Sequence, residues 1–127
     1  MVLAVDDDPD VLATISHMLH TRGFRVLTAL DTETALTVCQ QEGGAIDVLL
    51  ADLSLPGDLS GRLAQRVSSE FPSIKIIYVT GVPRFVALGS GLVRPDAPYL
   101  EKPVNPDALT GLIRRLLAES AREREQT

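Results

Sequence analysis

The sequence predicts an α/β fold: a doubly wound, five-stranded parallel sheet with helices on both faces. Two observations support this prediction. First, a helical pattern, or a possible one, follows each apolar strand-like run, and this alternation is typical of parallel sheets covered by helices. The strand-like runs lie at about residues 2–6, 24–29, 46–51, 74–79 and 98–101. Second, 127 residues, 45% of them hydrophobic, suit one domain, which we expect to span residues 1–127.

The first two helices have clear start and stop signals. Asp8 can cap the first helix with Pro9 at its first position, and Gly23 is expected to supply its C-cap. Asp31 can cap the second helix, which Gly43-Gly44 is expected to end. Each helix has an apolar stripe that predicts a buried face: Val11, Leu12, Ile15, Met18 and Leu19 in the first, and Ala35, Leu36, Val38 and Cys39 in the second.

The three later helices are less uniform. Ser60 or Asp58 can start the third, which should stop before Pro72. Between the fourth and fifth strands the chain is rich in glycine and proline, and an interior glycine costs a helix roughly 1 kcal/mol, so a short or frayed fourth helix is predicted. Asn105-Pro106 repeats the cap-plus-proline signal for the fifth helix. The charged run at 121–127 is expected to be a solvated helix end or a linker.

Composition excludes several classes of protein. The formal net charge of −5 leaves no excess of Lys and Arg to neutralise phosphates, so this domain is not expected to bind nucleic acid directly. No apolar run is long enough to span a membrane, and we expect no membrane contact from this segment. The single Cys39 cannot form an internal disulfide. A reducing cytoplasm is the expected setting.

Three aspartates end two of the apolar runs. Asp6 and Asp7 close the first strand, and Asp52 closes the third. Open parallel sheets bind ligands at the carboxyl ends of their strands, so these carboxylates are candidates for one crevice. Crowded carboxylates repel one another, and a hard divalent cation with oxygen ligands relieves the repulsion. The pattern therefore predicts an acidic Mg²⁺ site suited to phosphoryl chemistry.

Four motifs in a fixed order resemble the receiver domain of two-component response regulators. They are Val5-Asp6-Asp7-Asp8-Pro9-Asp10, Leu49-Leu50-Ala51-Asp52-Leu53-Ser54-Leu55-Pro56-Gly57, Val79-Thr80-Gly81 and Tyr99-Leu100-Glu101-Lys102-Pro103. The resemblance spans essentially the whole chain and implies a flavodoxin-like, CheY-like sheet of order 2-1-3-4-5. The loop at 56–61 is one residue longer than the commonest receiver spacing, a variant similar to receivers of hybrid sensor histidine kinases.

The resemblance assigns a role to each motif residue. It implies that Asp52 is the phospho-acceptor and that Thr80 and Lys102 bind the phosphoryl oxygens. It implies that Thr80 and Tyr99 form the switch, and that the bond before Pro103 is cis. The Mg²⁺ ligands that it implies are Asp6, Asp7, Asp52 and the backbone carbonyl of Ser54.

The function that the resemblance implies is signal transduction by phosphorelay. The domain would accept a phosphoryl group from a histidine kinase or a histidine phosphotransfer protein, and it would switch a protein-binding surface for a downstream protein or an attached output domain. We do not expect an enzyme beyond self-catalysed phosphotransfer and autodephosphorylation. Two alternatives are an aspartyl-phosphate-type metal-dependent phosphohydrolase and a degenerate receiver that acts only as a protein-interaction module. A flavodoxin-type carrier is disfavoured, because three aspartates would repel the flavin phosphate.

Overall fold

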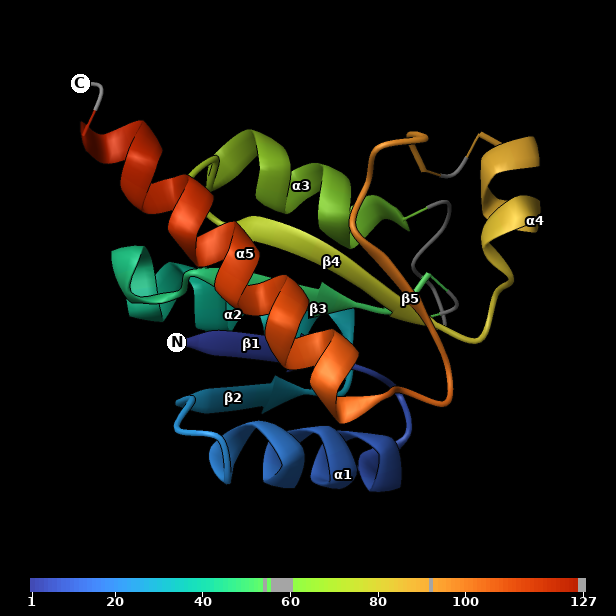
Figure 1. Ribbon diagram of the computed structural model, residues 1–127, viewed down its shortest axis with the longest axis horizontal. Helices are drawn as coiled ribbons and strands as arrows, with labels where there is room; N and C mark the ends of the chain where they lie inside the picture. Colours follow the sequence, from blue (N-terminus) through green and yellow to red (C-terminus); the bar gives the residue numbers. More distant parts are fainter. Residues whose placement is uncertain (54, 56–60, 92, 126–127) are drawn as a thin grey trace.

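A five-stranded, all-parallel sheet forms the middle layer of the protein. The computed structural model describes residues 1–53, 55, 61–91 and 93–125. The order of the strands is β2-β1-β3-β4-β5, as expected (Figure 1). Their bounds are β1 (Val2–Val5), β2 (Val26–Ala29), β3 (Val48–Ala51), β4 (Lys75–Thr80) and β5 (Tyr99–Glu101).

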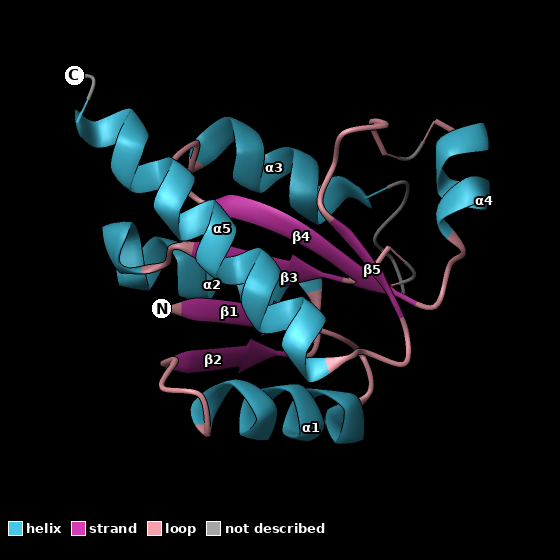
Figure 2. Ribbon diagram, in the orientation of Figure 1, coloured by secondary structure: helices cyan, strands magenta, loops and turns pink. Residues whose placement is uncertain are grey.

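Helices cover both faces of this sheet, which confirms the predicted doubly wound class (Figure 2). They are α1 (Pro9–His20), α2 (Thr32–Glu42), α3 (Arg62–Glu70), α4 (Arg84–Gly89) and α5 (Pro106–Glu125), with a short 3₁₀ turn, η1 (Gly43–Ala45), after α2. No helix in the described part of the chain is both long enough and apolar enough to cross a membrane.

β1 and β3 are buried on both faces of the sheet, because successive side chains alternate between the faces and helices cover each face. Leu3 and Leu49 pack with buried residues of α2 and α3. Ala4 and Leu50, each the next residue along, pack with α1 and α5. All residues of β1 and β3 are buried. This double burial fixes the ends of β1 and β3, from which the acidic side chains extend.

The predicted helix caps on three helices are confirmed. The Asp8 carboxylate accepts a hydrogen bond from the Asp10 amide, at 2.9 Å, and Pro9 begins α1. Asp31 accepts one from the Thr34 amide at 2.7 Å, and Asn105 accepts one from Ala108 at 3.0 Å. These contacts satisfy amide groups that the first turn of a helix leaves unpaired.

Gly23 is not the C-cap of α1, so that prediction is wrong. The helix ends at His20, and Thr21 is the capping residue, with its amide donating to the His17 carbonyl. Gly23 lies three residues past the helix with φ of 87°, and its amide donates to the His20 carbonyl. The left-handed conformation that called for glycine belongs to the turn into β2. The expected start of α3 at Asp58 or Ser60 lies outside the described residues, and α3 ends before Pro72, as predicted.

The fourth helix is short, as the glycines and prolines predicted. It has six residues, and Pro83 at its N-cap offers no side-chain hydrogen bond. Ala87 is its buried residue, whereas Phe85 is 76% exposed and Val86 is also exposed. In Figure 1 this helix stands apart from the other helices, at the end toward which the strand arrows point. Little apolar burial therefore holds α4 in place.

Candidate metal and phosphoryl-acceptor site

The sheet topology brings the three aspartates together. β1 and β3 are neighbours, with Val5 paired to Ala51, so Asp6 and Asp52 follow paired residues at the same edge of the sheet. Asp7 is the next residue after Asp6. Each of the three offers a carboxylate oxygen, and these oxygens all lie within 4.8 Å of one another. The acidic cluster expected at the ends of the first and third strands is thus formed by residues far apart in sequence.

Two of these carboxylates are deeply buried. Asp6 and Asp52 are 2% and 3% exposed, whereas Asp7 is exposed. Burial raises the pKa of the Asp6 carboxyl; the Asp52 charge adds to that rise, and hydrogen bonds from Lys102 and the Asp8 amide oppose it. The ionised form of Asp6 is therefore costly unless further positive charge approaches.

Lys102 supplies positive charge from the end of β5. Its Nζ donates to Oδ2 of Asp6 and to Oδ2 of Asp52, the latter at 2.8 Å. Burial acts to lower the pKa of the Lys102 ammonium, but the hydrogen bonds to Asp52 and Asp6 outweigh it, so the pKa is raised. The Lys102–Pro103 peptide bond is cis, as the resemblance implies. The contact with Asp6 was not predicted from the sequence.

The donor set suits a hard divalent cation. The three carboxylates carry three negative charges when ionised, and the Lys102 ammonium offsets one of them. Oxygen ligands of this kind are those that Mg²⁺ prefers, and two are buried against the ends of adjacent strands. The acidic cluster could therefore bind a metal. The fourth expected ligand, the Ser54 carbonyl, lies outside the described residues.

Thr80 and Tyr99, the expected switch residues, both contact Val82 just after β4. Thr80 is fully buried, and its Oγ1 accepts a hydrogen bond from the Val82 amide at 3.2 Å. The Tyr99 hydroxyl donates to the Val82 carbonyl. Burial raises the pKa of Tyr99, and the charges of Glu101 and Asp52 act in the same direction. Two side chains thus hold the segment that leads into α4.

Glu101 makes a contact with α4 that was not predicted from the sequence. This side chain is exposed, and its Oε1 accepts a hydrogen bond from the Arg84 amide at 2.7 Å. Arg84 is the first residue of α4 and lies 17 positions earlier in the chain. Only the approach of α4 to β5 in the folded protein creates the pair.

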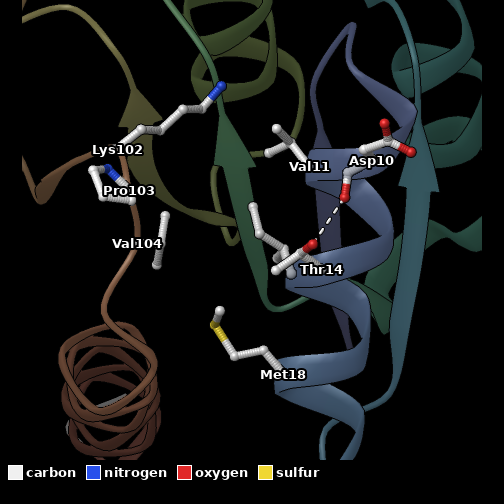
Figure 3. A pocket seen from close by; sticks show the side chains of 8 residues that line it. Asp10, Val11, Thr14, Met18, Lys102, Pro103 and Val104 are labelled. Carbon is white, nitrogen blue, oxygen red and sulfur yellow. Dashed lines mark hydrogen bonds between the residues drawn. The ribbon is translucent and has the colours of Figure 1, made fainter.

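An apolar groove opens beside Lys102. It has a volume of about 530 Å³ and lies between α1 and the segment that joins β5 to α5. Figure 3 shows Val11, Thr14 and Met18 of α1 on one side, and Pro103 and Val104 on the other. Among the described residues, the groove therefore meets the acidic cluster only at Lys102, whose ammonium contacts Asp6 and Asp52.

Comparison with known proteins gives consistent results. The response regulator receiver domain profile matches residues 2–114. Two-component response regulator ARR2 of Arabidopsis thaliana is 29% identical over 123 residues, covering 96% of this chain and 18% of that protein. Two-component response regulator ARR14 of the same plant is 26% identical over 111 residues, covering 87% of this chain and 29% of the relative. The chain therefore spans less than a third of these relatives.

A solved structure of similar sequence has the same fold. The CheY-like receiver domain protein of Methanospirillum hungatei superimposes with a TM-score of 0.80 at 30% identity, covering 96% of each chain. The order of the strands, the acidic cluster at their ends and the family profile agree with the resemblance read from the four motifs. The chain belongs to the receiver domain family of two-component response regulators, which is a family of signalling domains.

Proposed function

We propose that Asp52 accepts a phosphoryl group from a phosphohistidine on a histidine kinase or a histidine phosphotransfer protein, with Mg²⁺ as the cofactor. The observation that carries this proposal is the position of the Asp52 carboxylate. It is buried at the end of β3, has an oxygen within 4.8 Å of oxygens of Asp6 and Asp7, and accepts a hydrogen bond from Lys102 Nζ at 2.8 Å. One nucleophile thus has both a metal-ligating set and a cation beside it.

The transfer forms one bond and breaks another. A carboxylate oxygen of Asp52 bonds to phosphorus while the bond from phosphorus to the imidazole nitrogen breaks, and the electron pair stays on that nitrogen. The product is an acyl phosphate. Lys102 offsets the charge of the phosphoryl oxygens, because its ammonium already lies against Asp52. A Mg²⁺ ion held by Asp6, Asp7 and Asp52 would neutralise further charge when bound.

Thr80 is suited to detect the phosphoryl group. Its oxygen accepts a hydrogen bond from Val82, so its hydroxyl hydrogen can be donated to a phosphoryl oxygen. Aspartyl phosphate adds negative charge at the end of β3, which favours inward movement of Thr80 and Lys102. Movement of Thr80 and Tyr99 would displace Val82 and α4, and would change the surface that a downstream protein or an attached output domain reads. Direct binding to nucleic acid is not part of this proposal.

The same proposal covers the extent and setting of the domain. Residues 1–127 form one receiver domain, and α5 is part of it: Leu109 and Ile113 are buried in the core shared with α1, and Glu123 pairs with Lys75 of β4 at 2.9 Å. We place the relay in the cytoplasm, where kinases have ATP. The domain's own chemistry is limited to self-catalysed phosphotransfer and to hydrolysis of its acyl phosphate.

Acetyl phosphate and Mg²⁺ provide a direct test, read by intact-protein mass spectrometry. The parent should gain one phosphoryl group, Asp52→Asn should gain none, and Asp10→Asn, which changes a first-turn residue of α1, should label like the parent. Full labelling of Asp52→Asn would show that the acceptor is wrong. A parent that never labels would favour an interaction module. Repeated release of phosphate from added phosphate esters would favour the hydrolase alternative.

A further inference from the structure

Only a small apolar cluster lies beneath α4 in the described part of the chain. Among the described residues, the apolar cluster beneath this helix contains four buried members, namely Leu53, Ala87, Val93 and Tyr99. The two large clusters on the faces of the sheet do not include α4. Segments with few buried apolar contacts open at low free-energy cost, so each hydrogen bond that holds α4 has a large influence on its position.

Glu101 makes the contact that fixes the start of this helix. Its carboxylate accepts a hydrogen bond from the Arg84 amide at 2.7 Å, one of the amides that a helix leaves without an internal partner. Pro83, the N-cap residue, has no polar side chain to perform this task. The Arg84 guanidinium also donates to the Pro95 carbonyl at 2.6 Å. Arg84 therefore joins α4 to β5 through its backbone, and it joins α4 to the loop between α4 and β5 through its side chain.

Glu101 also lies between the two groups that would bind the phosphoryl oxygens. It pairs with Thr80 in the register of β4 and β5, and the next amide along, that of Lys102, donates to the Thr80 carbonyl at 2.9 Å. A shift of Lys102 or Thr80 toward a phosphoryl group would therefore move the backbone from which the Glu101 carboxylate extends. Glu101 therefore couples the start of α4 directly to the backbone beside the site.

We propose that Glu101 is a positioning residue: it holds the first turn of α4 against β5 in the unphosphorylated domain, and loss of its carboxylate shifts the domain toward its switched arrangement. This inference rests on the proposed function for its second half, because the switched arrangement is defined by phosphorylation. The first half concerns the unphosphorylated protein alone. The two halves therefore have separate measurements.

Amide hydrogen exchange of the unphosphorylated protein, read by NMR, tests the first half. Glu101→Ala should speed exchange of the Arg84 and Ala87 amides by roughly tenfold, since a charge-assisted hydrogen bond is lost. Glu101→Gln keeps an oxygen acceptor and should show a smaller increase. Glu119→Gln, which alters a partly exposed carboxylate 4.0 Å from Arg115 on α5, is the matched control and should leave both amides unchanged.

The rate of labelling by acetyl phosphate tests the second half. Glu101→Ala should label several-fold faster than the parent, with Glu101→Gln between them, because the carboxylate favours the unswitched arrangement. An equal rate in all three would overturn the coupling, even if α4 exchanged faster. Unchanged exchange at Arg84 and Ala87, or equal acceleration in β3, would overturn the positioning role. If the exchange pattern holds but the parent is never labelled, the proposed function fails and the cap stands.

Discussion

The acidic crevice and the α4 region lie at the same end of the sheet, yet they are held in different ways. Asp6 and Asp52 extend from β1 and β3, whose residues are all buried between two layers of helices. α4 has one buried residue, Ala87, and one partly buried apolar residue, Leu88, and the Glu101 carboxylate binds the amide of its first residue. The acidic groups are thus fixed by packing, whereas α4, the segment that we propose responds, has little packing and is held at its start by single hydrogen bonds.

Three of those contacts come from one patch of β4 and β5. Thr80 and Tyr99 hold the amide and the carbonyl of Val82, and Glu101 holds the amide of Arg84. Each is a single hydrogen bond, worth about 0.5–3 kcal/mol according to its charge. A phosphoryl group that draws Thr80 inward, as we propose, would therefore act on an element whose stabilisation is of similar size.

The largest expected contrast is in global stability. Leu49→Ala removes a fully buried side chain from β3 and should lower the free energy of unfolding by about 2–5 kcal/mol. Phe85→Ala, on the exposed face of α4, should change it by no more than about 0.5 kcal/mol. Urea unfolding measures both. Comparable losses would mean that α4 is as firmly packed as the central strands.

The affinity for Mg²⁺ should depend on Asp7 and not on Asp10, although the two aspartates are close in sequence. Asp7→Asn removes one of the three clustered carboxylates and should weaken Mg²⁺ binding by at least about tenfold, as expected for loss of a ligand. Asp10→Asn alters a first-turn residue of α1 outside the cluster and should have little effect. Titration with Mg²⁺ decides. Equal weakening would indicate that the acidic residues act only through their general field.

The response to a phosphoryl mimic should be confined to the less firmly packed region. Beryllofluoride with Mg²⁺ should change hydrogen exchange around residues 80–103 while β1 and β3 stay protected, because in the proposed route Thr80 and Tyr99, which both bind Val82, carry the change from the site to α4. Thr80→Ala should reduce this change and leave metal binding intact. A response limited to α1 and α2 would contradict the route and indicate another interface.

The smallest expected effect is on the pH dependence of stability. The folded protein raises the pKa of Tyr99 above the ordinary 10.0, so the unfolded chain releases this proton first as the pH rises. Stability should therefore fall between pH 10.0 and the raised pKa. In urea unfolding, Tyr99→Phe should make this fall shallower. Tyr78→Phe is a useful comparison, because burial raises the pKa of that tyrosine as well. An unchanged slope in Tyr99→Phe would contradict the expectation.

Signals in the sequence predicted the fold class and the order of the elements, which the structure confirms, and they named the candidate residues of the site. Strand and helix signals are local: Asp8 and Asn105 cap helices through amides two or three residues away, and the apolar runs define the strands. Glycine and proline also predicted that α4 would be short. The prediction that Gly23 caps α1 was wrong because a left-handed glycine is used both at a helix C-cap and in a turn, and the sequence signal is the same for both.

Contacts between side chains that are far apart in sequence depend on the tertiary structure. The contact of Lys102 with Asp6 spans 96 positions, and the contact of Glu101 with Arg84 spans 17. Neither residue type specifies its partner, because an exposed Glu or a Lys can pair with any neighbour that the fold supplies. Burial is likewise a property of the assembled layers. The fold buries Asp6, which raises the pKa of its carboxyl, whereas Asp7, the adjacent residue of identical chemistry, is exposed. The sequence predicts which residues are candidates for the site, whereas packing of the sheet between its helices determines their burial and contacts.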